Sequence, residues 1–148
     1  MSTPLAVVLA AVGGALIATQ GALFGPFTDR VRNVMVVALW VHVAGALFAG
    51  AVVLFGRYEL GITELRNAPW LLLAGVAGVG IVASVGAVVG YLGLGTTLAV
   101  LTGVQLLIAL LLDASGILER TVELSPSRLL GAALIVGGVL LVFGRGEA

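Results

Sequence analysis

Three side chains in the apolar part of the sequence have the chemistry to bind a solute or carry a proton: Gln105, Gln20 and His42. Gln105 lies in the middle of an uncharged run, where an amide has two donors and an acceptor to satisfy in hydrocarbon. Its partner is either a polar solute or another helix, through Ser84, Gln20 or a backbone carbonyl. Both interpretations stay open for Gln105. For Gln20, nearer the end of its segment, the interhelical bond is favoured.

His42 is the only strongly titratable side chain well inside an apolar segment. An imidazole changes charge between about pH 5 and 8, so His42 is a candidate proton site in a transport cycle. No carboxylate lies nearby in the sequence, which favours a packed core histidine over a proton carrier. Trp40 lies two residues away, roughly opposite on a helix, so we expect the two side chains not to line one cavity.

Gln105 belongs to a stripe of small and polar residues that recur at steps of three and four: Gly95, Ala99, Thr102, Gln105, Ala109 and Asp113. Such residues share one face of a helix. The preceding segment has a matching line: Ala77, Gly80, Ser84, Ala87 and Tyr91. Faces of this kind turn away from lipid. We therefore expect the two stripes to line a solute cavity, with Gln105 near its centre and with Thr102, Ser84 and Gln20 as further binding residues. Asp113 ends its segment and is interpreted as a helix-end charge.

Several functional classes find no support in the composition. Cysteine is absent, and no Ser/His/Asp set, carboxylate pair or histidine cluster occurs at a suitable spacing. We therefore expect no enzyme, no metal and no cofactor. The chain has seven basic and seven acidic residues and a formal net charge of zero, so it lacks the basic surface that nucleic-acid binding requires. The expected partners are a lipid bilayer and a small-molecule solute.

The elements that position these residues are membrane-spanning helices. Hydrophobic residues make up 61% of the chain and charged residues 9%, whereas soluble domains carry roughly 25% charged residues. A helical span needs about 20 apolar residues, and five segments qualify: 4–24, 34–55, 70–91, 96–112 and 129–143. The first is interpreted as a span and not as a cleaved signal peptide. The sequence thus predicts an all-α, polytopic membrane protein with a single domain over residues 1–148.

Local signals set the boundaries of these spans. The uncharged run from Asn67 to Leu112 is too long for one crossing of a core about 30 Å thick. It must fold back, and the glycine-rich stretch 90–95 predicts the turn. Prolines 4, 69 and 126 mark three helix starts. Asp29, Arg30 and Arg32 are predicted to lie in the turn after the first span, and residues 57–66 to form a polar connection. The last span is short, so the arginines that flank it are expected to snorkel to the two interfaces.

The arginines give little orientation bias. The side that holds the N-terminus is predicted to carry four of them, Arg57, Arg66, Arg120 and Arg128, and the other side three, Arg30, Arg32 and Arg145. Because an excess of Lys and Arg orients a membrane protein, such a near-tie permits insertion both ways up. The alternative is that one well-placed arginine decides the orientation.

The second half of the chain carries a set of motifs: the glycine-rich turn, Gly103-x-Gln105, Asp113-x-x-Gly116, Leu124-Ser125 and Arg128-Leu129-Leu130-Gly131. It resembles the small, half-length YdcZ-like family of the drug/metabolite transporter superfamily, and the first half resembles it through Gly14, Gln20 and Gly45. The family usually shows an asparagine where this chain has Phe24, which alters the site if that asparagine binds solute. A histidine at the position of His42 is not expected from the family.

The resemblance implies a half-transporter with five helices, one of the two inverted repeats of a full-length member. Such a chain must dimerise, with an inverted copy of itself or with a related half-size chain, to rebuild a two-repeat cavity. The near-even arginine count fits the first option. The resemblance implies an integral protein of a prokaryotic plasma membrane. No acid lies deep in a span, so a neutral or zwitterionic solute is expected. The alternative function is a non-transporting membrane subunit that stabilises a partner protein.

Overall fold

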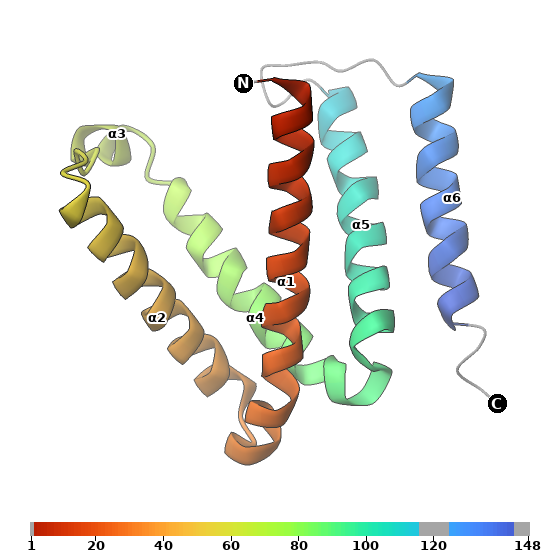
Figure 1. Cartoon of the computed structure of the whole chain (residues 1–148), viewed down its shortest axis with the longest axis horizontal. Coiled ribbons are helices and arrows are strands. Elements are labelled where there is room, and N and C mark those ends of the chain that lie inside the picture. Colours follow the sequence, from red (N-terminus) through yellow and green to blue (C-terminus); the bar gives the residue numbers. More distant parts are fainter. Residues whose placement is uncertain (1, 116–124, 144–148) are drawn as a thin grey trace. The chain divides into compact units, whose positions relative to one another are not determined.

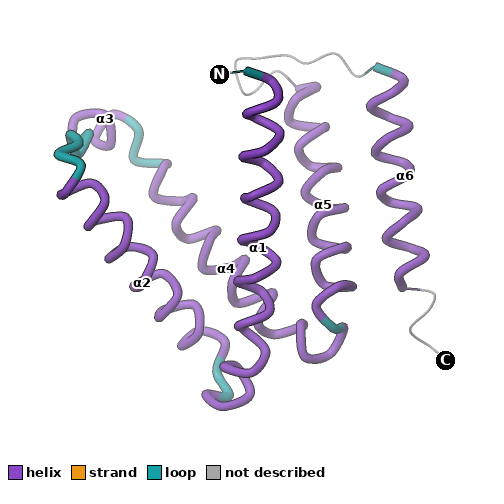
Figure 2. Tube along the Cα trace, in the orientation of Figure 1, coloured by secondary structure: helices purple, strands orange, loops and turns teal. Residues whose placement is uncertain are grey.

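The computed structural model describes residues 2–115 and 125–143, and every regular element in them is a helix (Figures 1 and 2). The helices are α1 (Thr3–Val31), α2 (Val34–Phe55), α3 (Ile62–Asn67), α4 (Leu71–Leu92), α5 (Leu94–Ser115) and α6 (Pro126–Phe143). They belong to two compact units, Met1–Tyr91 and Leu92–Ala148. The single-domain organisation stays a prediction. The motif residues Gly116 and Leu124 and the arginines Arg120 and Arg145 lie outside the described residues.

The length and composition of the helices confirm the membrane class. Four of them, α1, α2, α4 and α5, are long and apolar enough to cross a bilayer, and α6 holds a shorter apolar helix, Pro126–Val142. Large apolar side chains point outward along these helices, among them Leu16, Phe48, Leu73, Val76 and Leu141. In water such a surface would aggregate, whereas in a bilayer it faces lipid tails. The chain is therefore a polytopic helical membrane protein.

The end of α1 differs from the prediction. The helix continues past Phe24 to Val31, with Pro26 inside it, so the predicted turn over Asp29 and Arg30 is wrong. Only the third charged residue, Arg32, lies in the turn, in a left-handed conformation (φ 56°) with its N–H donating to the Thr28 carbonyl at 2.7 Å. Charged residues remain helical at the end of a span when they reach the interface, so they did not mark the turn itself.

The connection from α1 to α2 is shorter than expected and is closed by a side-chain cap. Asn33 is the N-cap of α2, and its side-chain oxygen accepts a hydrogen bond from the Met35 N–H at 2.9 Å. This bond satisfies a backbone donor that the first turn of a helix leaves free. Arg32 and Asn33 alone therefore join the two helices, which run in opposite directions in the first unit (Figure 1).

The connection between α2 and α4 contains a helix that the sequence did not predict. The six-residue α3 begins after Gly61, which has a φ of 56°. Its end is closed by the Ala68 N–H, which donates to the Glu64 carbonyl at 2.9 Å. Six residues are too few for a helical period to emerge from the sequence pattern. The predicted polar connection over residues 57–66 is thus partly helical.

The predicted break in the long apolar run is confirmed at a single residue. Gly93 has a φ of 76° and separates α4 from α5, a conformation that favours glycine. The span predicted over 70–91 is therefore shifted by one residue, to Leu71–Leu92, and the span predicted over 96–112 extends to Leu94–Ser115. Within the second unit, α6 begins at Pro126, where a missing backbone N–H costs nothing.

Two glycines of α4 lie where this helix approaches α1 and α2 in the first unit. A Cβ at Gly86 would lie 3.4 Å from Thr28 Oγ1 of α1, and one at Gly78 would lie 3.0 Å from His42 Nε2 of α2. In the second unit α5 packs along α6, and a Cβ at Gly103 would lie 3.1 Å from Val139. Small residues permit such approaches where no hydrophobic force drives helices together.

The contact between His42 and Gly78 gives a stability prediction. Gly78→Ala should destabilise the protein by about 1–3 kcal/mol, because the added methyl overpacks the contact. The ring cannot turn away freely, since Nδ1 is held 2.7 Å from the Ala38 carbonyl. The measurement is unfolding of the purified protein in detergent.

Gly80→Ala is the matched control for this variant. A Cβ at Gly80 meets no atom within 4 Å, so alanine there should be neutral or stabilising by roughly 0.5–1 kcal/mol. His42→Ala should relieve the cost of Gly78→Ala. Equal effects at the two glycines, or no relief in the double variant, would contradict this packing.

Candidate solute-binding residues

Gln105 lies midway along α5 and is exposed. Within the described part of the second unit, its amide has no hydrogen-bond partner. An amide at that depth in hydrocarbon costs free energy unless its donors and acceptor are paired. A group beyond the described residues of this unit must therefore supply those bonds. Both interpretations of Gln105, a bound solute and an interhelical bond, remain compatible with this position.

Thr102 lines a groove between α5 and α6 of about 480 Å³. Gly95 and Ala99 of the same stripe line it too, opposite Ile135 and Gly138 of α6. The sequence analysis assigned the whole stripe to a cavity shared with the preceding helix. It had no signal for α6, because the two helices are separated by a long connection.

Gln20 lies on α1 beside aromatic side chains. It lines a groove of about 390 Å³ between α1 and α2 together with Phe24, Phe27 and Trp40. Phe24 is buried and lines this groove together with Val37 and Trp40 of α2. Gln20 was predicted as a binding residue from the sequence, whereas the aromatic side chains around it were not.

Ser84 lies on α4 and is exposed. Its neighbours Val85 and Gly86 are buried in the first unit, so the hydroxyl lies at the border of that contact. Ser84 does not line the groove that holds Gln20. Ser84 and Gln20 therefore do not line a common groove within the first unit.

His42 is half-buried on the face of α2 that contacts α4. A carbonyl oxygen only accepts, so the Nδ1 atom 2.7 Å from the Ala38 carbonyl carries the hydrogen and donates it. The other ring nitrogen, Nε2, lies beside Gly78. Trp40 lines the groove on the α1 side of α2, and His42 does not, as the sequence predicted. The local geometry is that of a hydrogen-bonded core histidine.

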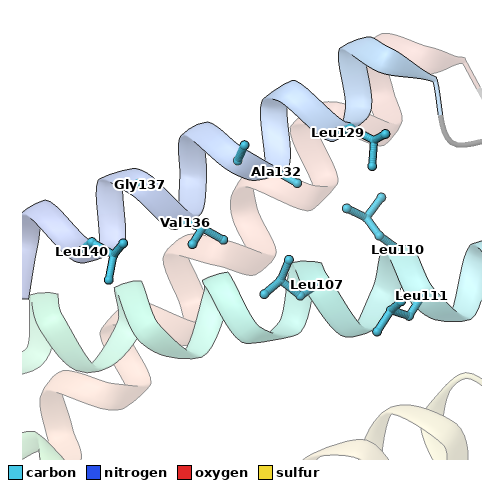
Figure 3. A pocket seen from close by; sticks show the side chains of 9 residues that line it. Leu107, Leu110, Leu111, Leu129, Ala132, Val136, Gly137 and Leu140 are labelled. Carbon is cyan, nitrogen blue, oxygen red and sulfur yellow. The ribbon is translucent and has the colours of Figure 1, made fainter.

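Two further grooves run between α5 and α6. The larger, about 670 Å³, is lined by apolar residues alone, among them Leu107, Leu110 and Leu111 of α5 and Leu129, Val136 and Leu140 of α6 (Figure 3). The smaller, about 360 Å³, holds the charged side chains Asp113 and Arg128. Asp113 was interpreted as a helix-end charge, and nothing in the sequence indicated this groove, because its other wall is formed by α6.

The comparisons with known proteins agree with the resemblance noted in the sequence. Residues 5–141 match the family described as "putative inner membrane exporter, YdcZ". No curated protein and no solved structure matches the chain. The family match spans most of the chain, including Gln20, Gln105 and Arg128. The chain therefore belongs to the YdcZ family of the drug/metabolite transporter superfamily and is an integral, multi-pass protein of a membrane transporter family.

Proposed function

We propose that this chain assembles as a dimer and exports a small neutral or zwitterionic organic solute. Membership of a transporter family supports transport, and the family's description as inner membrane exporters supports the outward direction. In this proposal Gln105, Thr102, Ser84 and Gln20 bind the solute. Gln105 lies nearest the centre of the cavity. The chain acts without a catalytic residue, cofactor or metal of its own.

The observation that carries this proposal is the amide of Gln105 at the middle of α5, which has no hydrogen-bond partner among the described residues of its unit. A buried donor or acceptor without a partner costs about 1–3 kcal/mol. A lipid tail offers no hydrogen-bond partner, so an amide of Gln105 that faced lipid would raise the free energy of the folded protein permanently. A cavity that admits water and solute removes that cost and gives the amide a function.

The number of apolar helices supports dimerisation. Five apolar helices make one repeat of a two-repeat transporter, and an odd number of crossings places the two termini on opposite sides. A second copy in the opposite orientation therefore supplies the second repeat. The near-even distribution of the arginines supports this homodimer over a heterodimer with a related half-size chain.

Gln105→Leu tests the role of the amide. We expect at least about tenfold weaker solute binding or transport, which is about 1.4 kcal/mol. Dimer and thermal stability should stay within about 1–2 kcal/mol, because interhelical hydrogen bonds in membranes contribute less than that. The measurements are transport in vesicles and the oligomeric state in detergent.

Thr19→Val is the matched control, since the Thr19 hydroxyl is exposed on α1 but already donates to the Ala15 carbonyl at 2.9 Å. This variant should transport like the native protein. If Gln105→Leu instead fails to assemble while the protein that does fold transports normally, the amide is a structural bond. A chain that is stable only with a co-expressed partner would indicate the non-transporting subunit.

Dual topology is tested with paired reporters at the C-terminus, one active only in the cytoplasm and one only outside it. Because the arginine bias is small, both reporters should be active in cells that make the native chain. Replacing Arg57 and Arg66 by neutral residues should shift the signal toward one orientation. A single orientation that these substitutions do not move would exclude the antiparallel homodimer.

A proton role in the transport cycle is the second interpretation of His42, beside the packing role that its local geometry favours. Its Nδ1 donates to Ala38, so a proton would be taken up at Nε2, beside Gly78. His42→Gln keeps a polar side chain but cannot titrate. It should abolish solute accumulation driven by a pH gradient and spare exchange down a solute gradient, both measured in proteoliposomes. Accumulation that persists in the variant would leave His42 as a packing residue.

A further inference from the structure

The described parts of α5 and α6 carry one acid and one base, Asp113 and Arg128, and both line the same groove of about 360 Å³. Asp113 lies in the last turn of α5 and Arg128 in the first turn of α6. The two charges therefore lie at the same end of this helix pair. They form no ion pair with each other, and neither has another charged partner within residues 92–115 and 125–143.

The rest of this groove is apolar. Leu106, Leu110 and Ile135 form its walls deeper along the two helices. The groove therefore changes along its length, from opposite charges near the helix ends to aliphatic side chains toward the middle of the membrane. A ligand complementary to it has a head with both charges and an apolar tail.

The apolar part continues into the neighbouring groove. Ile135 lines both grooves, the second of which also contains Thr102 and Gly95. On α5 the lining residues Ala99, Thr102 and Leu106 follow at steps of three and four, so they share one face. From Asp113 to Gly95 this face extends about 27 Å at about 1.5 Å per residue, close to the thickness of the hydrocarbon core.

We propose that this side of the α5–α6 pair binds a single-chain zwitterionic amphiphile, with its ammonium group at Asp113, its anionic group at Arg128 and its tail along Leu106 and Ile135. Each charge of the ligand then has a protein partner of opposite sign. A singly charged amphiphile would leave either Asp113 or Arg128 without a partner, and an uncharged amphiphile would leave both without one. Naming this ligand as the exported substrate rests on the transport function proposed above, whereas the binding itself does not.

The test is a binding titration of the purified protein in a non-ionic detergent. Three probes share one short alkyl tail: a lysophosphatidylethanolamine, an alkyl phosphate and an alkylammonium. Free phosphoethanolamine supplies the same head without a tail. We expect the zwitterionic amphiphile to bind at least about tenfold more tightly than each of the other three probes, which is about 1.4 kcal/mol.

Two variants must change the order of affinities in opposite ways. Asp113→Asn should remove the preference for the zwitterion over the alkyl phosphate, because the ammonium group loses its partner. Arg128→Gln should remove the preference over the alkylammonium. Asp29→Asn and Arg30→Gln, at the exposed end of α1, are the matched controls and should keep the native order. A merely structural role would weaken all probes alike.

An unchanged order of affinities in both groove variants would overturn the proposal. Equal binding of free phosphoethanolamine would also overturn it, because the ligand would then be a water-soluble zwitterion that does not use the apolar track. Loss of transport in Gln105→Leu with this order of affinities intact leaves the groove assignment in place. Transport without any dependence on head charge overturns only the naming of this ligand as the exported substrate.

Discussion

Hydrocarbon offers no hydrogen-bond partner, and the rest of this structure depends on that constraint. Backbone groups are paired within helices, and three polar side chains solve the same problem locally. Thr19, His42 and Thr97 each bond to the carbonyl four residues before them, at 2.9, 2.7 and 2.8 Å. Gln20 and Gln105 have no such bond among the described residues of their units. The two glutamines therefore mark surfaces that need something other than lipid.

Close packing imposes a second requirement, and glycine meets it. At Gly86 the backbone of α4 comes near the Thr28 hydroxyl, whose oxygen is buried with no hydrogen-bond partner in the part of the chain that the structure describes. At Gly78 it comes near the imidazole of His42. Glycine thus lets a polar atom lie against the backbone of a neighbouring helix, whereas a larger residue would keep the two apart. Gly78 permits the approach of α4 to α2 and at the same time borders the imidazole of His42.

Much of the fold follows from the sequence because a bilayer restricts the alternatives. The apolar runs predict helices, and Gly93 breaks the longest of them where a left-handed residue is required. The helical extension of α1 to Val31 and the short α3 were not predictable in this way. Both lie where water replaces lipid and charged residues are compatible with helix or turn. There the choice depends on local caps such as Asn33.

The candidate site was less predictable than the fold, since it depends on which helices are neighbours. Periodicity identified the face of α5 that holds Thr102 and Gln105, but it gave no information on α6, which lines the groove beside Thr102. The charged groove of Asp113 and Arg128 was unpredictable for the same reason, because one of its walls is formed by α6. Contacts between residues separated by a long connection leave no local pattern in a single sequence.

The central claim is that the α5 face around Gln105 borders a wet cavity, and cysteine accessibility tests it most directly. The chain has no cysteine, so Gln105→Cys and Val104→Cys each introduce a single thiol midway along the same helix. Only an ionised thiol in contact with water reacts with a charged thiol reagent. The account predicts modification at position 105, slowed by a transported solute, and none at position 104. Equal protection of both positions would show that lipid covers Gln105 and would contradict the account.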